Sequence, residues 1–181
     1  MSTRTLLTLK QFEQLPDEPG KRELLKGELL ELPPASNDHN KVAHIIFRQL
    51  DPAIEKAKLR GEASLLGETR FEVSYLMGGG SWLQPDLSVT HPGQRTSGIY
   101  LAGSPAIAIE VVSPSNTPRA LAIKTAVYFE HGALEVWHFH PKKGHVVRHV
   151  AGVADPIIIR DFVRTPLLPG FALDVQQTLK P

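Results

Sequence analysis

Three ionisable side chains stand at places in the sequence where a charge is hard to accommodate. Glu110 interrupts an apolar run, since Ile107-Ala108-Ile109 precedes it and Val111-Val112 follows it. Such a run predicts a short strand that is buried on both faces. A buried carboxylate needs a partner, because its transfer out of water is strongly unfavourable. Lys124 and Asp86 are the candidate partners, and the three side chains together predict a chemical site.

The chemistry that fits two carboxylates and an amine is metal-assisted hydrolysis. Asp86 and Glu110 side by side would repel each other and raise one of their pKa values unless a cation lay between them. Mg²⁺, or Mn²⁺ in its place, takes oxygen ligands, commonly one or two carboxylates with waters and a substrate phosphate. We therefore predict Asp86 and Glu110 as metal ligands. Lys124 is then the catalytic cation, which orients or activates the attacking water or stabilises charge on phosphorus.

Each of these residues also has a simpler interpretation. Asp86 follows Pro85 and could be only a turn residue. Glu110 and Lys124 could be only a buried structural ion pair. The occurrence of all three, on two strands and one helix, favours the site over these alternatives.

The element that must position Lys124 is a helix whose start and stop signals are both present. Thr117 is suited to the N-cap, Pro118 to the first helical position, and Gly132 to the end. Inside it, one apolar stripe contains Lys124. The stripe follows the spacing i, i+3, i+4 and i+7 and consists of Leu121, Lys124, Thr125 and Tyr128. The ammonium group is therefore predicted on the inward side of the helix.

The residues before this unit predict a short helix, a hairpin and a long helix. The short helix is expected from Leu9 to Leu15, and Lys26-Gly27 is typical of a hairpin turn. The long helix is expected from a cap at Asn37 or Asp38 to about residue 60, with a kink or a break at Pro52.

Four side chains in this part are accessory candidates. Glu23, Glu28 and Glu31 are expected to be solvated strand positions, although one of them could reach a metal site. His39 stands near the start of the long helix. It is either an exposed cap-region histidine or a residue at the mouth of a site, where helix N-termini favour anions.

The remaining segments alternate between strand and loop. Residues 62–76 are expected to form a strand broken at Gly67, and 91–104 a loop. Two further strands, 135–140 and 145–150, should form a hairpin with four histidines on one face, namely His138, His140, His145 and His149. This face is expected to be solvated, with a metal patch or a pH-sensitive surface as the alternatives. Ile157 to Arg160 and Phe171 to Val175 are expected as closing strands.

The composition describes an ordinary globular chain. It has 181 residues, of which 41% are hydrophobic and 22% charged, and it contains no cysteine. This excludes disulfides and thiolate metal sites. The net charge of +1 excludes a strongly basic DNA-coating protein, so we expect a second subunit, in a dimer, if duplex DNA is bound. No signal peptide or membrane helix is visible, and we expect a cytoplasmic protein.

Several segments also carry a family resemblance. They are Arg22-Glu23-Leu24-Leu25-Lys26-Gly27-Glu28-Leu29, Pro85-Asp86, Ile109-Glu110-Val111-Val112-Ser113-Pro114-Ser115, Lys124, Tyr128, Gly132, Glu135-Val136-Trp137 and Pro166-Leu167-Leu168-Pro169-Gly170-Phe171. In this order and spacing they resemble the Uma2 family of restriction-endonuclease-like proteins, within the PD-(D/E)XK nuclease superfamily.

The resemblance implies an α/β fold with a mixed central β-sheet flanked by helices, and a Mg²⁺-dependent nuclease acting on DNA. A single domain over residues 1–181 would contain an N-terminal helix and hairpin (8–32), a long helix (37–60), a catalytic core (62–140) and C-terminal strands (145–176). Asp86 and Glu110 match the metal ligands, Lys124 the displaced lysine, and Glu23 and His39 two further family positions.

The sequence departs from the family pattern at three points. Ala120 replaces an acidic residue four positions before Lys124, Lys26 replaces an Asp at the hairpin turn, and Trp137-His138-Phe139-His140-Pro141 replaces Trp-x-Val-Asp-Pro. The acid missing at Ala120 would help to hold Lys124. A catalytically degenerate nuclease-fold module, serving in binding or assembly, is therefore the alternative function.

Overall fold

The protein is described by a computed structural model that covers residues 6–180. Most of its strands form two mixed sheets, and two short strands, described below, form a separate pair. The N-terminal sheet contains, in order, β2 (Glu28–Leu32), β1 (Lys21–Leu25), β5 (Ser81–Leu83), β4 (Tyr75–Met77), β8 (Tyr100–Ala102) and β7 (Thr96–Ser97). The central sheet contains β12 (Ile157–Ile159), β11 (His145–Val150), β10 (Glu135–His140), β9 (Ile107–Val111), β6 (Leu87–Val89) and β3 (Thr69–Phe71). Each sheet has one parallel pair, β4 with β8 and β9 with β10.

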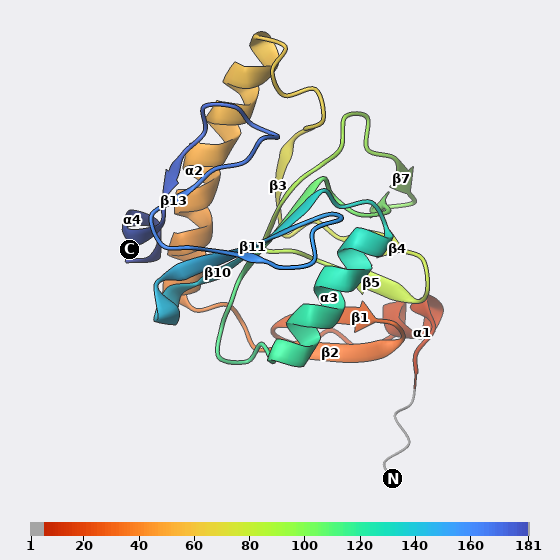
Figure 1. Ribbon diagram of the computed structural model, residues 1–181. Coiled ribbons are helices and arrows are strands. Elements are labelled where there is room, and N and C mark those ends of the chain that lie inside the picture. The colour runs from red at the N-terminus through yellow and green to blue at the C-terminus, as the bar shows by residue number, and fades with distance from the viewer. Residues whose placement is uncertain (1–5, 181) are drawn as a thin grey trace.

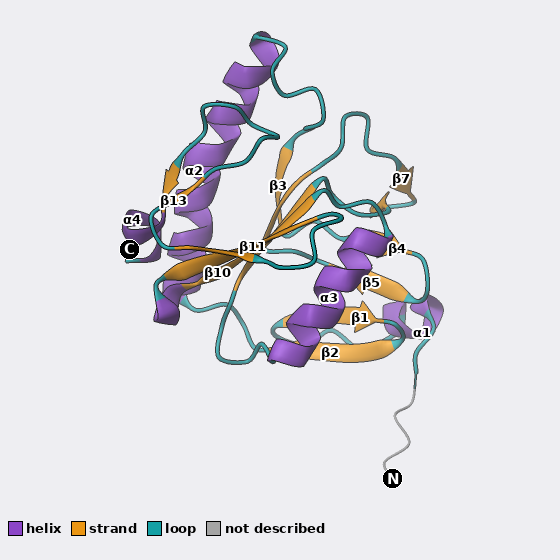
Figure 2. Cartoon of the chain, viewed as in Figure 1, coloured by secondary structure: helices purple, strands orange, loops and turns teal. Residues whose placement is uncertain are grey.

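Two long helices lie on different sides of the central sheet (Figure 1). The first, α2 (Asn37–Leu59), lies with α4 (Val175–Leu179) and the small pair β13 (Phe162–Val163) and β14 (Leu173–Asp174). The second, α3 (Pro118–Glu130), packs with the N-terminal sheet, and the short α1 (Leu9–Glu13) lies at the far side of that sheet from α3 (Figure 2). Within residues 6–180, no helix combines the length and apolar character needed to cross a membrane.

The two faces of the central sheet are buried in two separate cores. The α2 side contains Ile107, Ile109 and Val111 of β9 together with the buried stripe of α2. The α3 side contains Ala108 of the same strand, together with residues of α3 and of the N-terminal sheet. Because side chains alternate along a strand, Glu110 points with Ala108 toward α3. The α/β class with mixed sheets and flanking helices is therefore confirmed, with the strands divided between two sheets.

The hairpins and helix caps follow the sequence signals closely, with two corrections. The turn at Lys26-Gly27 joins β1 to β2, with φ values of 52° and 83°. In α2, Ser36 is the N-cap in place of Asn37 or Asp38, because its side chain accepts a hydrogen bond from the His39 N–H. The helix also continues through Pro52 (Figure 2), so the break expected there as one alternative is absent, and its apolar stripe is buried on both sides of the proline.

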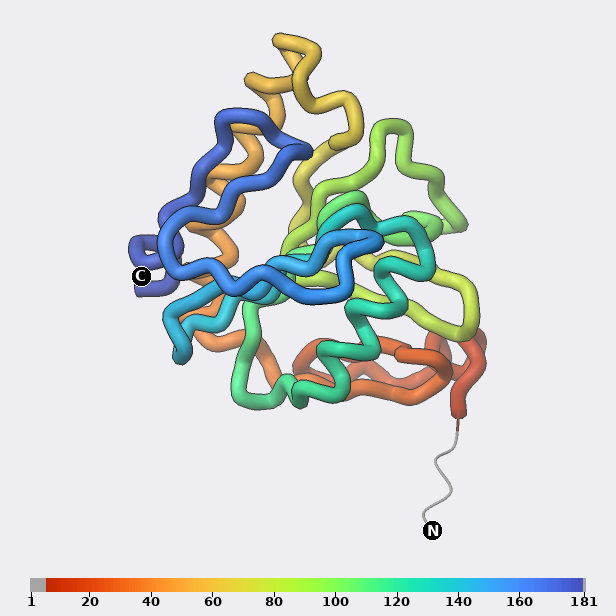
Figure 3. Tube along the Cα trace, viewed as in Figure 1, coloured from red at the N-terminus to blue at the C-terminus, as the bar shows by residue number. Residues whose placement is uncertain are grey.

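Other corrections concern segments where tertiary contacts decide the backbone. Of the strand expected over 62–76, only β3 and β4 are present, because 62–68 is irregular and the chain is interrupted again at 72–74, where Glu72 has a φ of 42°. The expected loop over 91–104 contains β7 and β8. Of the strand expected from Phe171 to Val175, only Leu173–Asp174 is present, since the Asp174 side chain caps α4. The C-terminal segments lie beside α2 (Figure 3).

Candidate active site

Glu110 and Lys124 meet between the central sheet and α3. The stripe predicted for α3 is buried as expected, and Lys124 is only 2% exposed. Its Nζ lies 2.5 Å from Glu110 Oε1 and 3.0 Å from Glu23 Oε2. Tyr128, one turn further along α3, donates a hydrogen bond of 2.8 Å to the same Glu110 oxygen. The predicted meeting of strand and helix is therefore present, and it includes a second acid.

Glu23 belongs to this cluster, which corrects the expectation that it is solvated. Its side chain is fully buried, and its Oε1 accepts hydrogen bonds from Lys124 Nζ at 3.1 Å and from the Gln84 N–H at 2.9 Å. Two positions earlier on the same face of β1, Lys21 lies 4.0 Å from Glu23 Oε1 through its Nζ. The inward face of β1 therefore contributes one carboxylate, of Glu23, and one ammonium group, of Lys21, to the cluster.

Asp86 precedes β6, whose antiparallel register with β9 places it beside the end of the strand that carries Glu110. Its Oδ2 accepts a hydrogen bond of 2.7 Å from the Val111 N–H and lies 3.1 Å from His39 Nε2. Its Oδ1 lies 2.9 Å from Lys21 Nζ. Asp86 is thus fixed to the neighbouring strand, to α2 and to β1, and it is more than a turn residue.

A pocket of about 640 Å³ opens at this place. Lys21, His39, Asp86 and Glu110 all line it, and Ser36 at the start of α2 forms part of its wall. Lys124 and Glu23 instead line a smaller pocket of about 280 Å³. The two pockets adjoin, because they share three lining residues, Leu32, Ser115 and Asn116. The two predicted metal ligands therefore share one opening to solvent, and the predicted catalytic lysine lies behind them.

The ionisation of the cluster follows from these contacts. Burial alone would raise the pKa of Asp86, but the Lys21 ammonium and the hydrogen bond to His39 outweigh it and hold that pKa below its usual value. The hydrogen bond to Asp86 raises the pKa of His39. Burial raises the pKa of Glu110, although Lys124 and Lys21 oppose the rise.

The pKa of Lys124 is raised. Burial would lower it, but the attraction of Glu110 and Glu23 is larger in total. Lys124 is therefore a charged ammonium group at neutral pH. It is a source of positive charge for the cluster and not a proton acceptor.

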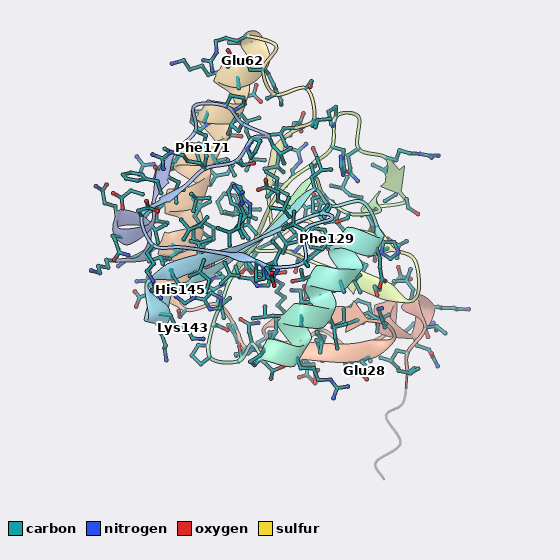
Figure 4. All side chains as sticks on the ribbon, in the orientation of Figure 1. Glu28, Glu62, Phe129, Lys143, His145 and Phe171 are labelled. Carbon is teal, nitrogen blue, oxygen red and sulfur yellow. The ribbon has the colours of Figure 1, made fainter. Side chains whose placement is uncertain are left out.

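The remaining candidate acids lie elsewhere on the hairpin. Glu28 stands at the start of β2, opposite Leu25 and next to the turn, at the end of the hairpin away from Lys21 (Figure 4). Glu31 is exposed, and its Oε1 lies 3.1 Å from Arg22 Nε. Neither Glu28 nor Glu31 is among the described residues that line the pocket beside Asp86, but Glu31 lines the smaller pocket with Glu23 and Lys124.

The donor set of this pocket suits a hard divalent ion in number and type. Asp86 and Glu110 supply carboxylate oxygens, and Mg²⁺ commonly uses one or two carboxylates together with waters. In the part of the chain that the structure describes, no three His, Asp or Glu side chains are grouped as a metal cage. A metal here would therefore depend on two protein ligands, and the Lys21 ammonium already contacts one of them.

The four histidines of the β10–β11 hairpin share a face, as predicted from the pairing of His140 with His145. Their rings are in contact, with centroids 4.9 Å apart for His138 and His149 and 5.0 Å for His140 and His145. His138 is buried, however, and its Nε2 lies 3.2 Å from the Thr125 hydroxyl of α3, so the face is not wholly solvated. His145 stands at the turn end of the hairpin, close to Lys143 (Figure 4).

Comparison with known proteins identifies the family. The Uma2 family, described as "putative restriction endonuclease", matches residues 9–176. The chain belongs to the Uma2 family. A crystal structure of a "putative nuclease belonging to DUF820" from Anabaena variabilis has the same fold, with a TM-score of 0.75, 17% sequence identity, and coverage of 96% of this chain and 97% of that one. None of the curated proteins compared with the chain matches it.

For this Uma2 chain, sequence reasoning missed Lys21 as a member of the site. The signal was present in the spacing of Lys21, Glu23 and Leu25, which places all three on one face of β1. The adjacent Leu24 obscured it, because two neighbouring leucines do not show which face is inward.

Proposed function

We propose that this Uma2 protein hydrolyses phosphodiester bonds of DNA with the help of Mg²⁺ or Mn²⁺. The observation that carries the proposal is that Asp86, immediately before β6, and Glu110, on the adjacent β9, line one open pocket. Membership of a family described as putative restriction endonucleases supports the choice of DNA as the substrate.

The chain's own residues would hold the ligands in place. Asp86 is oriented by the Val111 N–H and by His39. Glu110 is oriented by Tyr128 and by Lys124. A divalent ion held by these two acids would neutralise charge on the phosphate and lower the pKa of the attacking water. Lys124 keeps Glu110 ionised and in position, and its charge acts on the pocket through that carboxylate.

The start of α2 would help to bind the substrate. Ser36 and His39, in its cap and first turn, line the pocket, and the N-terminus of a helix favours anions such as phosphate. The chain as a whole is nearly neutral, at a net charge of +1. We therefore propose that a homodimer supplies the additional contacts that duplex DNA requires.

The test is a cleavage assay on supercoiled plasmid and on single-stranded DNA, with Mg²⁺, with Mn²⁺ and with chelator. Asp86→Asn should reduce cleavage by more than about a hundredfold, because it removes a metal ligand. Glu62→Gln, an exposed acid beyond the end of α2 that pairs with Arg60, is the control and should leave the rate unchanged. Cleavage that persists with chelator or in Asp86→Asn would contradict the proposal.

A second candidate is the catalytically degenerate module that serves in binding or assembly. It is favoured by the engagement of Lys124, whose ammonium contacts both Glu23 and Glu110 behind the main pocket. Ala120 also leaves α3 without an acid one turn before it. Calorimetry separates the two candidates, since the module predicts no heat of Mn²⁺ binding in the wild type and an equal result in Asp86→Asn.

A further inference from the structure

Lys21 occupies the position in which a cation is expected. Its ammonium lies 2.9 Å from Asp86 Oδ1 and 4.0 Å from Glu23 Oε1, and it lines the same pocket as Asp86 and Glu110. One of the two predicted metal ligands is therefore already paired with a positive charge that the chain itself supplies.

The backbone fixes this placement. Gly20, immediately before Lys21, has a φ of +113°, and a Cβ there would lie 2.3 Å from the Leu32 carbonyl oxygen. Only glycine can pass so close, so the direction in which the chain enters β1 is set. The lysine stem remains long and flexible, and 15% of the side chain is exposed to the pocket, so the ammonium has a path away from Asp86.

The charges of the cluster favour an exchange. Three carboxylates, of Glu23, Asp86 and Glu110, face two ammonium groups, of Lys21 and Lys124, which leaves one negative charge when His39 is neutral. A divalent ion added to this set would leave one positive charge. If the Lys21 ammonium moves out to solvent as the ion enters, the charges cancel, and a buried cluster is most stable when its charges are paired.

We propose that Lys21 is an internal competitor of the metal ion, whose ammonium pairs with Asp86 in the ion-free protein and leaves it when a divalent cation binds. This inference rests on the proposed function only for the presence of the metal. It adds that the ion-free site is held together by a lysine, and that the affinity for the ion is lower than two carboxylates alone would give.

The experiment measures the affinity for Mn²⁺, from the electron paramagnetic resonance signal of the free ion, at one pH and salt concentration. Lys21→Met should bind Mn²⁺ about tenfold more tightly than the wild type, because a charge-assisted hydrogen bond no longer has to be broken. Lys21→Arg keeps the competing charge and should bind nearly as the wild type does. Lys58→Met, which removes an exposed lysine paired with Glu55 on α2, is the matched control and should not change the affinity.

A thermal unfolding series covers the case in which Lys21→Met folds poorly. Without metal, the variant should unfold at a lower temperature than the wild type. Saturating Mn²⁺ should raise its Tm by more than it raises that of the wild type. Asp86→Asn should remove the gain in affinity, which locates the ion beside the exchanged lysine.

The outcomes separate this inference from the proposed function. Equal or weaker Mn²⁺ binding by Lys21→Met, with Asp86-dependent cleavage intact, overturns the competition and leaves the nuclease. A gain that survives Asp86→Asn places the ion elsewhere and also overturns it. Absence of Mn²⁺ binding in both the wild type and Lys21→Met overturns both proposals.

Discussion

The carboxylate of Asp86 accepts a hydrogen bond of 2.7 Å from the backbone N–H of Val111, the residue that follows Glu110. The two acids are therefore fixed relative to each other through the backbone of β9 and not only through their shared pocket. This bond keeps Asp86 in place whichever cation is nearby, so the site is organised before any ligand arrives. Preorganisation of this kind removes the need to order the ligands at the moment of binding.

Lys124→Met should destabilise the fold by about 3–5 kcal/mol at pH 8, because it leaves Glu23 and Glu110 buried without their ammonium. The loss should become smaller as the pH falls toward 5, since a carboxyl group without its cation takes up a proton. Urea unfolding at both pH values measures this. The control Lys58→Met removes a surface ion pair and should change the stability by less than about 1 kcal/mol. A loss for Lys124→Met that does not depend on pH would contradict the account.

Tyr128→Phe and Tyr75→Phe form a matched pair of buried hydroxyl deletions. Tyr128 donates to a carboxylate, Glu110, at 2.8 Å, whereas Tyr75 donates to the neutral hydroxyl of Ser88 at 2.9 Å. Loss of the bond to the charged acceptor should lower the free energy of unfolding by about 1.5–3 kcal/mol, and loss of the neutral one by about 1 kcal/mol. Chemical denaturation of both variants decides this. Equal losses would show that Glu110 is not ionised in the folded protein.

His138 should make the fold sensitive to mild acid. Burial, with smaller contributions from His149 and His140, lowers the pKa of His138 to about 3. In the unfolded chain a histidine titrates near pH ~6.5, so between these values the unfolded state binds the extra proton. Stability should therefore be fully present above pH ~6.5 and fall by about 1.4 kcal/mol per pH unit below it, until the folded form is protonated.

The check is the difference between wild type and His138→Gln in urea unfolding from pH 7 to pH 5. This range lies above the titration of Asp86, whose pKa is lowered in the fold and whose contribution is lost only in stronger acid. In His138→Gln the free energy of unfolding should fall less steeply with falling pH than in the wild type, by the slope of about 1.4 kcal/mol per pH unit that one proton contributes. His44→Gln, which removes an exposed histidine of α2, is the control and should leave the pH dependence unchanged. Parallel curves for wild type and His138→Gln would contradict the prediction.

The first hairpin should gain stability from a better turn residue. Lys26 has a φ of 52°, a conformation that asparagine adopts more readily than lysine. Lys26→Met removes the surface ion pair with Glu130 but keeps the backbone strain, so it serves as the reference. Lys26→Asn should be more stable than Lys26→Met by about 0.5–1 kcal/mol, measured by thermal unfolding. No difference between the two would show that the turn is not strained.

Sequence periodicity was sufficient to predict the direction of a side chain wherever that direction depends on residues nearby in the chain. The inward position of Lys124 follows from the spacing of Leu121, Thr125 and Tyr128, and the pairing of His140 with His145 follows from the length of one turn. The burial of Glu23 and the role of Lys21 depend instead on how the N-terminal sheet docks against α3, which no local pattern contains. The division of the strands between two sheets depends on the same docking.

The alternation along β9 has a consequence for folding fidelity. Ile109 faces the core on the side of α2, while Glu110 faces α3 and its lysine. A slip of β9 by one residue would exchange these faces. The Glu110 carboxylate would then lie in the apolar core on the α2 side, and the Lys124 ammonium would lose this partner. A strand in the wrong register would therefore be strongly destabilised, so the ion cluster favours one alignment of β9 over the alternatives.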